Sequence, residues 1–114
     1  MRLGAVIHRL EQEPPLLVLP VGWDNPHSYR GYYECVAFER RTNVTVADCL
    51  AAARDALGST YTGWKGGDYD MDEWTDCYLV AEEGSLGEEI TPTMLDLNIA
   101  SALAADPATE EGTP

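Results

Sequence analysis

Basic residues are scarce in this chain. One lysine and six arginines stand against 20 acidic residues, which gives a formal net charge of −13 over 114 residues. Proteins that bind duplex DNA or anionic membrane surfaces need clustered Lys and Arg side chains to displace counterions. The scarcity of cations therefore excludes ordinary binding to nucleic acid or to an anionic membrane.

The chain also lacks a long apolar run. No stretch approaches the roughly 20 apolar residues of a membrane span, and residues 1–13 lack the uncharged apolar core of a signal peptide. With 45% apolar residues, the chain can still bury one core. We therefore expect a cytoplasmic protein with a single domain over residues 1–105. Residues 106–114 offer nothing to bury, which predicts a disordered acidic tail.

Cysteine is sparse as well. The three cysteines, Cys35, Cys49 and Cys77, are an odd number and form no CxxC pair. Together with two histidines they do not complete the four ligands of a zinc site. Each cysteine stands in an apolar stretch, so we expect buried free thiols. No metal and no cofactor are predicted.

Hydrophobic spacing predicts three helices. An apolar stripe indicates a first helix over residues 2–12. Thr45 and Asp48 are spaced as a capping box, so the clearest helix is expected to begin there and to end at Gly58. A third helix is predicted over residues 92–103, where a proline stands at the first position.

Four short segments have the composition of strands, namely residues 16–19, 33–40, 60–62 and 77–81. Residues 20–33 are predicted as a long loop, because they contain two prolines and two glycines. This order of elements predicts an α+β two-layer domain. We expect a three- to four-stranded antiparallel or mixed sheet with about three helices on one face.

The aromatic residues are unevenly distributed. Nine of the ten fall in residues 20–33 and 61–78, and each segment also has a cation beside a glycine. Aromatic faces stack on flat rings, glycine allows close backbone approach, and cations pair with phosphate. The pattern predicts a pocket for a nucleotide-like ligand, although these aromatics could instead form a satellite core. The predicted ligand-binding residues are Tyr29, Arg30, Tyr32, Trp64, Lys65, Gly66 and Tyr69.

Two known motifs are approached without being matched. Residues 58–65 nearly fit a phosphate-binding loop, but Trp64 stands before the lysine and the helix precedes the loop. Residues 68–73 begin like a calcium loop, but Glu73 and Leu79 occupy the positions that need glycine and glutamate. An incidental divalent ion on this acidic run stays open beside a solvated acidic face.

Catalytic candidates are few. Asp24, His27 and Ser28 have the residue types of a hydrolytic triad, but residues so close in sequence rarely converge with the required geometry. His27 or Glu34 is a better candidate for general acid–base work. The sequence favours binding over catalysis and leaves open whether the chain is an enzyme.

Residues 25–33 and 62–69, with residues 43–48 between them, resemble a group of small uncharacterised proteins of actinobacteria and their phages. The likeness covers about residues 3–100, and no activity is assigned to the group. It implies a small, phage-type protein of the host cytoplasm. Size and origin suggest action against host defence, either by sequestering a nucleotide signal or by occupying a defence protein.

Three functions therefore compete at this point. The first is a protein that binds and sequesters a nucleotide-derived small molecule, with Arg30 and Lys65 at the phosphate. The second is an acidic inhibitor that binds a protein partner, such as a host defence protein, as a mimic of nucleic acid. The third is a small nucleotide hydrolase that uses His27 or Glu34. A homo-oligomer is compatible with all three.

Overall fold

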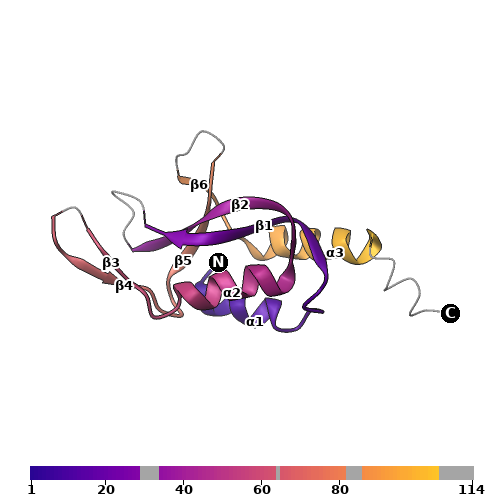
Figure 1. Ribbon diagram of the computed structural model, residues 1–114, viewed down its shortest axis with the longest axis horizontal. Coiled ribbons are helices and arrows are strands. Elements are labelled where there is room, and N and C mark those ends of the chain that lie inside the picture. The colour runs from indigo at the N-terminus through magenta and orange to yellow at the C-terminus, as the bar shows by residue number, and fades with distance from the viewer. Residues whose placement is uncertain (29–33, 64, 82–85, 106–114) are drawn as a thin grey trace.

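A long β-hairpin runs through the computed structural model, which describes residues 1–28, 34–63, 65–81 and 86–105 (Figure 1). Its antiparallel strands are β1 (Val18–His27) and β2 (Cys35–Thr45). β5 (Asp76–Val80) lies parallel to β2, and β6 (Leu86–Glu89) lies antiparallel to β5. The result is a mixed four-stranded sheet in the order β1-β2-β5-β6, which confirms the predicted α+β class.

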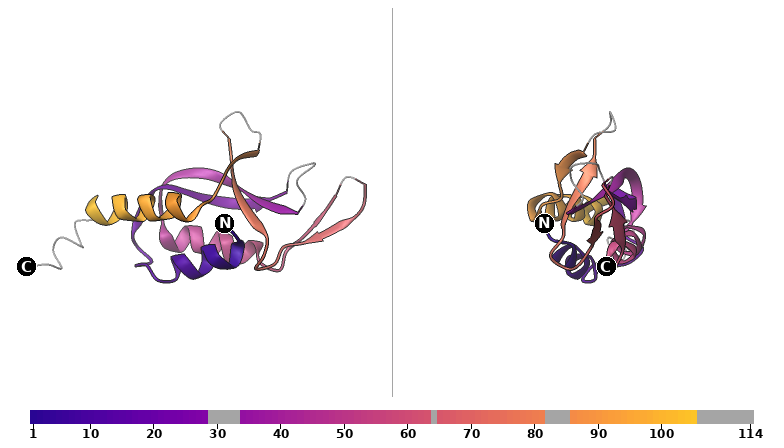
Figure 2. Two further views of the ribbon diagram at one scale, coloured as in Figure 1. Left: turned by 180° about the vertical axis from the view of Figure 1, so that it is seen from behind. Right: turned by 90° about the vertical axis from the view of Figure 1, so that its left-hand side faces the viewer.

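The three predicted helices are present as α1 (Leu3–Leu10), α2 (Val46–Ala56) and α3 (Pro92–Ala105). Figures 1 and 2 show α1 and α2 side by side below the curved hairpin, with α3 running behind it. The core lies between these layers and includes Leu3, Leu10, Leu19, Phe38, Leu79 and Leu95. The predicted disordered tail, residues 106–114, lies outside the described residues.

A short second hairpin is inserted between α2 and β5. Two parallel strands need a crossover connection, and here the chain passes from β2 through α2 before it returns as β5. Within this return, β3 (Thr60–Thr62) and β4 (Asp68–Asp70) pair antiparallel. We call residues 60–70 the finger, because they project away from the sheet and helices in Figures 1 and 2.

The predicted loop over residues 20–33 is wrong for its first part, because residues 20–27 belong to β1. Trp23 is only 1% exposed, and its ring centroid lies 5.8 Å from that of Phe38. The indole N–H donates to the Cys49 carbonyl oxygen at 3.1 Å. Trp23 is therefore a core residue that joins β1 to α2.

The position of β1 in the sheet explains the error. β1 is an edge strand, and prolines such as Pro20 and Pro26 are tolerated at edges. Gly22 is required for close packing, because a Cβ there would clash with the Val44 side chain and lie 2.6 Å from Cys49 Sγ. Residues that ordinarily break a strand are thus compatible with this one.

Other boundaries differ from the predicted ones for a related reason. β2 continues to Thr45, beyond the predicted end at residue 40, because its polar second half pairs with β1. β4 and β6 were not predicted. β4 is formed by Asp68, Tyr69 and Asp70, and aspartate is depleted in strands. Pairing with distant segments, more than local composition, decides these strands.

Helix α3 is attached to the edge strand β1 through one side chain. The Val21 N–H donates to Asn98 Oδ1 at 3.2 Å, and Asn98 Nδ2 donates back to the Val21 carbonyl oxygen. Leu95, Ile99 and Ala102 bury the apolar side of α3. Both backbone polar groups of Val21 are thereby satisfied by a single carboxamide.

All three thiols are free, as predicted, and Cys49 and Cys77 are buried while Cys35 is half-buried. Burial disfavours the charged thiolate. It raises the pKa of Cys49 from its ordinary value of 9.0 to about 11 and that of Cys77 to about 12. These cysteines therefore act as small apolar core residues.

We predict that Thr45→Ala lowers the free energy of unfolding by about 1 kcal/mol. Asp48 N–H donates to Thr45 Oγ1 at 3.1 Å, and Thr45 N–H donates to Asp48 Oδ2 at 3.2 Å, so the capping box is complete. Urea unfolding followed by circular dichroism measures the change. Thr93→Ala, at an exposed helical position, is the control. Equal loss in both variants would contradict the cap.

We predict that stability falls as the pH rises above about 9. The unfolded chain releases the thiol protons from about pH 9, whereas folded Cys49 and Cys77 keep theirs until about pH 11 and 12. Stability is therefore full below pH 9 and declines by up to about 1.4 kcal/mol per pH unit for each thiol. The measurement is urea unfolding at pH 8.5 and 10.5. The double variant Cys49→Ala, Cys77→Ala should show a shallower decline, and an equal slope would refute this explanation.

Candidate functional site

A groove of about 320 Å³ opens where the finger leaves the body of the protein. Its walls come from three pieces of chain, namely the residue before β2, strand β4, and the connection from β4 to β5. We call it the acidic groove, because four of its seven lining residues are carboxylates. The lining residues are Glu34, Asp68, Tyr69, Asp70, Asp72, Trp74 and Thr75.

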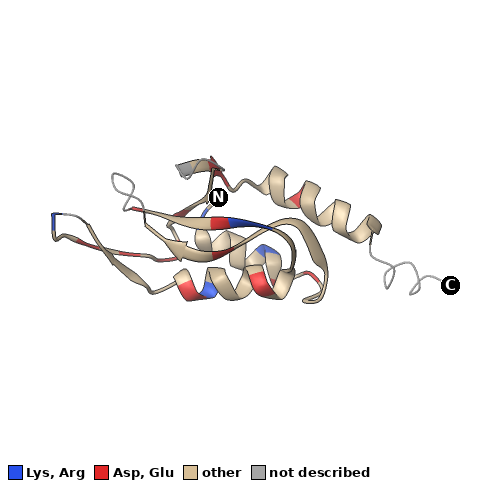
Figure 3. Cartoon of the chain, turned by 45° about the horizontal axis from the view of Figure 1, so that its top comes forward, with Lys and Arg blue, Asp and Glu red and all other residues tan. Residues whose placement is uncertain are grey.

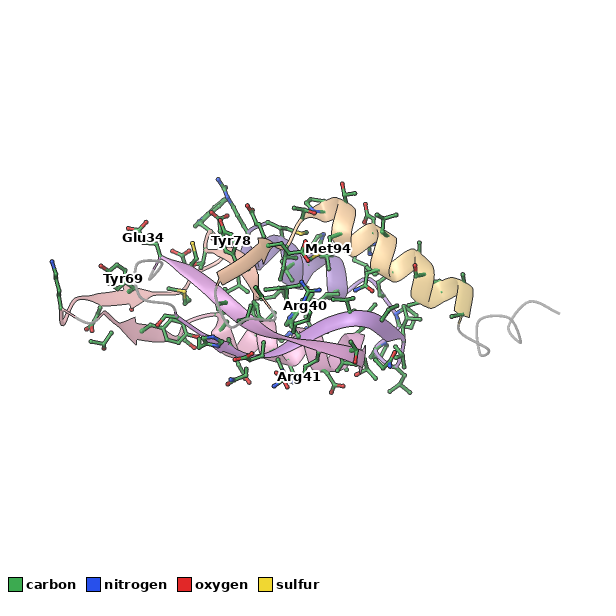
Figure 4. The ribbon with its side chains drawn as sticks, turned by 90° about the horizontal axis from the view of Figure 1, so that it is seen from above. Glu34, Arg40, Arg41, Tyr69, Tyr78 and Met94 are labelled. Carbon is green, nitrogen blue, oxygen red and sulfur yellow. The ribbon has the colours of Figure 1, made fainter. Side chains whose placement is uncertain are left out.

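The parallel register of the main sheet brings Glu34 to this place. Cys35 of β2 stands opposite Asp76 of β5, so the preceding residues Glu34 and Thr75 are neighbours at the same end of the two strands. Figure 4 shows Glu34 close to Tyr69 of the finger, whereas Arg40 and Arg41 lie further along the long hairpin. Residues separated by more than 30 positions in the sequence thus line one groove.

The finger separates its polar and aromatic side chains onto opposite faces. Thr60 pairs with Asp70, and the threonine hydroxyl donates to Asp70 Oδ1 at 2.6 Å. Thr62 and Asp68 repeat this contact at 3.1 Å. Side chains alternate between faces along a strand, so Tyr61 and Tyr69, which pair between these positions, lie on the other face. Both tyrosines pack partly against the core, and burial raises the pKa of Tyr61.

A tight turn fixes the last part of the groove. Asp72 Oδ1 accepts from the Trp74 N–H at 2.9 Å and from Thr75 Oγ1 at 3.4 Å. Thr75 Oγ1 in turn accepts from the Asp72 N–H at 2.9 Å. Thr75 is buried by this arrangement, and the Trp74 side chain is left 63% exposed. The groove therefore has a large aromatic ring at its rim, next to a carboxylate that is already oriented.

The structure brings together only some of the predicted ligand-binding residues. Tyr69 lines the acidic groove beside Glu34, which was predicted as an acid–base candidate. Lys65 and Gly66 lie in the turn between β3 and β4, and Gly66 has a positive φ of 90° there. Neither lines the groove. The predictions for Tyr29, Arg30, Tyr32 and Trp64 concern residues outside the described part of the chain.

His27 does not share a cavity wall with Glu34 in the acidic groove. It ends β1 opposite Ala37, with Nδ1 2.9 Å from the Asn25 carbonyl oxygen and Nε2 3.9 Å from Glu39 Oε1. The lining residues of the groove include Glu34 but not His27. The two acid–base candidates therefore belong to different places, and they do not form a pair in this arrangement.

Each of the five arginines within the described ranges has a partner in the same chain. Figure 3 shows these cations dispersed over the molecule and acidic residues along the finger. Arg2 stacks on Trp74, with its guanidinium carbon 5.0 Å from the ring centroid. The remaining four arginines form ion pairs with carboxylates, namely Arg9–Glu13, Arg9–Asp96, Arg40–Glu88, Arg41–Asp24 and Arg54–Glu11.

The acidic side chains do not form a metal site among the residues that the structure describes. No three His, Cys, Asp or Glu side chains in these ranges are placed to hold a metal ion together. The described residues of the acidic run 68–73 therefore do not provide a cluster of ligands for a divalent ion.

A second groove, of about 440 Å³, lies between β1 and α2. It is lined by Asp24, Asp48 and Asp55 together with Trp23 and Pro26.

The residues of the acidic groove are noticeable in the sequence, but the sequence does not show that they lie together. Residues 68–73 were recognised as an acidic run and Glu34 as an isolated acid. Trp74 was recognised only as one of nine clustered aromatics. The usable signal was the spacing of Thr60 and Thr62 against Asp68 and Asp70, which suits cross-strand pairs around a glycine-rich turn.

Comparison with known proteins gives no guide to this groove. The chain matches no protein-family model, no curated protein and no solved structure. None of the helices in the described ranges has both the length and the apolar character needed to cross a membrane. What the groove binds must therefore be inferred from its own residues.

Proposed function

We propose that this chain is a binding protein whose acidic groove receives a positively charged segment of a protein partner. The observation that supports this proposal is the composition of the groove. Four of the seven lining residues are carboxylates, two are aromatic and none is basic. This proposal takes up the second of the three functions considered from the sequence, the acidic protein that binds a protein partner.

Charge favours a cationic partner over a phosphate-bearing one. Glu34, Asp70 and Asp72 are all exposed at the groove, and the whole chain has a net charge of −13. A field of one sign raises the association rate of an oppositely charged partner and repels a like-charged one. A phosphate would have to enter the groove against four carboxylates, whereas a basic peptide would neutralise them.

Trp74 and Tyr69 add apolar contact surface to the charge of the groove. Trp74 is 63% exposed at the rim, and tryptophan is among the residues that most often dominate protein interfaces. Tyr69 is half-buried on the finger beside it. The Trp74 ring provides apolar surface at the rim against which the stem of a long basic side chain can pack. A groove of this size suits one or two such side chains.

We predict that labelled peptides of alternating basic residues and glycine bind the protein and that an alternating glutamate–glycine peptide does not. Replacing Asp70 and Asp72 by Asn keeps their hydrogen-bond acceptors and removes two charges. This double variant should bind about tenfold more weakly, since exposed charge pairs contribute roughly 0.5–1 kcal/mol each. Fluorescence anisotropy measures the affinity.

The matched control is Glu88→Gln with Asp96→Asn, which removes the same charge at two exposed positions outside both grooves. It should leave peptide affinity nearly unchanged. Equal weakening in both double variants would show that the general field binds the peptide and that the groove does not. Absence of binding by every basic peptide at low ionic strength would overturn the proposal.

A nucleotide-derived ligand is the second candidate, and one observation favours it. Residues 29–33 lead directly into Glu34, and Lys65 lies in the turn of the finger that carries Tyr69. Of the two aromatic segments, the second contributes Tyr69 and Trp74 to the groove and carries Lys65 on the same finger. A phage-type protein that sequesters a host nucleotide signal, or hydrolyses it, would use this arrangement.

We predict for this candidate a rise in melting temperature with nucleotides or cyclic dinucleotides. Arg30→Ala and Lys65→Ala should each weaken binding by about 30-fold, since truncating a charged partner of a buried phosphate costs roughly 2–5 kcal/mol. Recovery of an intact ligand indicates sequestration, and an altered ligand indicates hydrolysis. Parental affinity in both folded variants would rule out the phosphate pocket.

A further inference from the structure

The environment of Trp74 indicates which cation the acidic groove selects. Of the five arginines in the described ranges, Arg2 is the one whose partner is an aromatic ring instead of a carboxylate. Its guanidinium carbon lies 5.0 Å from the centroid of the Trp74 ring, within the range of a cation–π contact. This ring therefore already binds one planar cation.

Backbone contacts build this stacking into the fold. The Leu3 N–H donates to the Thr75 carbonyl oxygen at 2.7 Å, and the Gly4 N–H donates to the Glu73 carbonyl oxygen at 2.9 Å. These two acceptors flank Trp74 on both sides in the sequence. A Cβ at Gly4 would lie 2.9 Å from Glu73 Cβ, so the two segments are in close contact. The start of α1 thus holds Arg2 beside the indole.

Arg2 occupies the ring from outside the acidic groove. Trp74 is one of the lining residues of the groove and Arg2 is not. Trp74 is 63% exposed and lines the groove, so the indole keeps accessible surface beside Arg2. A second planar cation can reach that surface from within the groove, next to the carboxylates.

The carboxylates are arranged to receive several N–H donors at once. Asp70 and Asp72 each use Oδ1 for a hydrogen bond within the protein. Their Oδ2 atoms, and both oxygens of Glu34, accept no hydrogen bond from the residues that the structure describes. A guanidinium presents five N–H donors in one plane, so it can stack on a ring and bind carboxylates at its edge. A lysine ammonium is a compact, strongly hydrated charge with three donors, so it stacks less well on the ring and lacks the planar edge of donors.

We propose that the acidic groove is selective for arginine side chains and that stacking on Trp74 provides this selectivity. The inference rests on the proposed function and adds the chemical class of the recognised group. The occupant is an exposed arginine of a basic peptide segment. Its guanidinium stacks on the groove side of Trp74 and donates to Asp70, Asp72 or Glu34.

The test compares two labelled ten-residue peptides of equal charge, one alternating arginine with glycine and the other lysine with glycine. The arginine peptide should bind the full chain about threefold to tenfold more tightly in fluorescence anisotropy. Trp74→Leu should abolish this preference while changing the affinity of the lysine peptide little. Trp74→Tyr, which keeps an aromatic face, should retain part of it.

The matched control is Leu97→Ala, at a position on α3 that is 66% exposed and distant from the groove in sequence. It should keep the full preference, and circular dichroism verifies the fold of every variant. Equal affinity of the two peptides for the parent chain would overturn arginine selectivity and leave the proposed function standing. A preference that survives Trp74→Leu would refute the role of the ring. Failure of both peptides to bind would remove the proposed function and this inference together.

Discussion

Burial of Trp23 is the contact on which the rest of the structure depends. Its indole lies between the hairpin and α2, packs near Phe38 and donates its N–H to the Cys49 carbonyl oxygen. Burying a side chain of this size contributes roughly 3 kcal/mol, and the N–H group needs a partner when it is buried. The neighbouring Gly22 lets α2 approach β1 closely. The position of α2 then determines where the chain returns as β5 and where the finger is inserted.

The helices could be predicted from the sequence because their signals are local. The capping box of Thr45 and Asp48 and the positive φ of Gly58, 85°, mark both ends of α2 as expected. The extent of β1 could not be predicted in the same way. Pro20, Gly22 and Pro26 argue for a loop when considered alone, and only the edge position of β1 and its packing on α2 make them acceptable.

The candidate site depends still more on contacts that the sequence does not encode locally. Glu34 joins the groove through the parallel register between β2 and β5, and register follows from the packed sheet as a whole. Trp74 gains its orientation from a turn made by Asp72 and Thr75. Composition alone shows acids and aromatics in the right numbers. It cannot show that the pairing of β2 with β5 brings Glu34 next to acidic residues that lie more than 30 positions further along the chain.

The carboxamide of Asn98 has a consequence for assembly. An edge strand as long as β1 is a template on which another chain can add a strand, because its outward backbone groups are unpaired. At Val21 the side chain of Asn98 supplies one donor and one acceptor, as the backbone of an added strand would. Addition of a strand beyond β1 is thereby blocked at Val21 by a side chain of the same molecule. An Asn98→Leu replacement would offer neither group, and the backbone of Val21 would then be free to pair with a strand of a second copy of the chain.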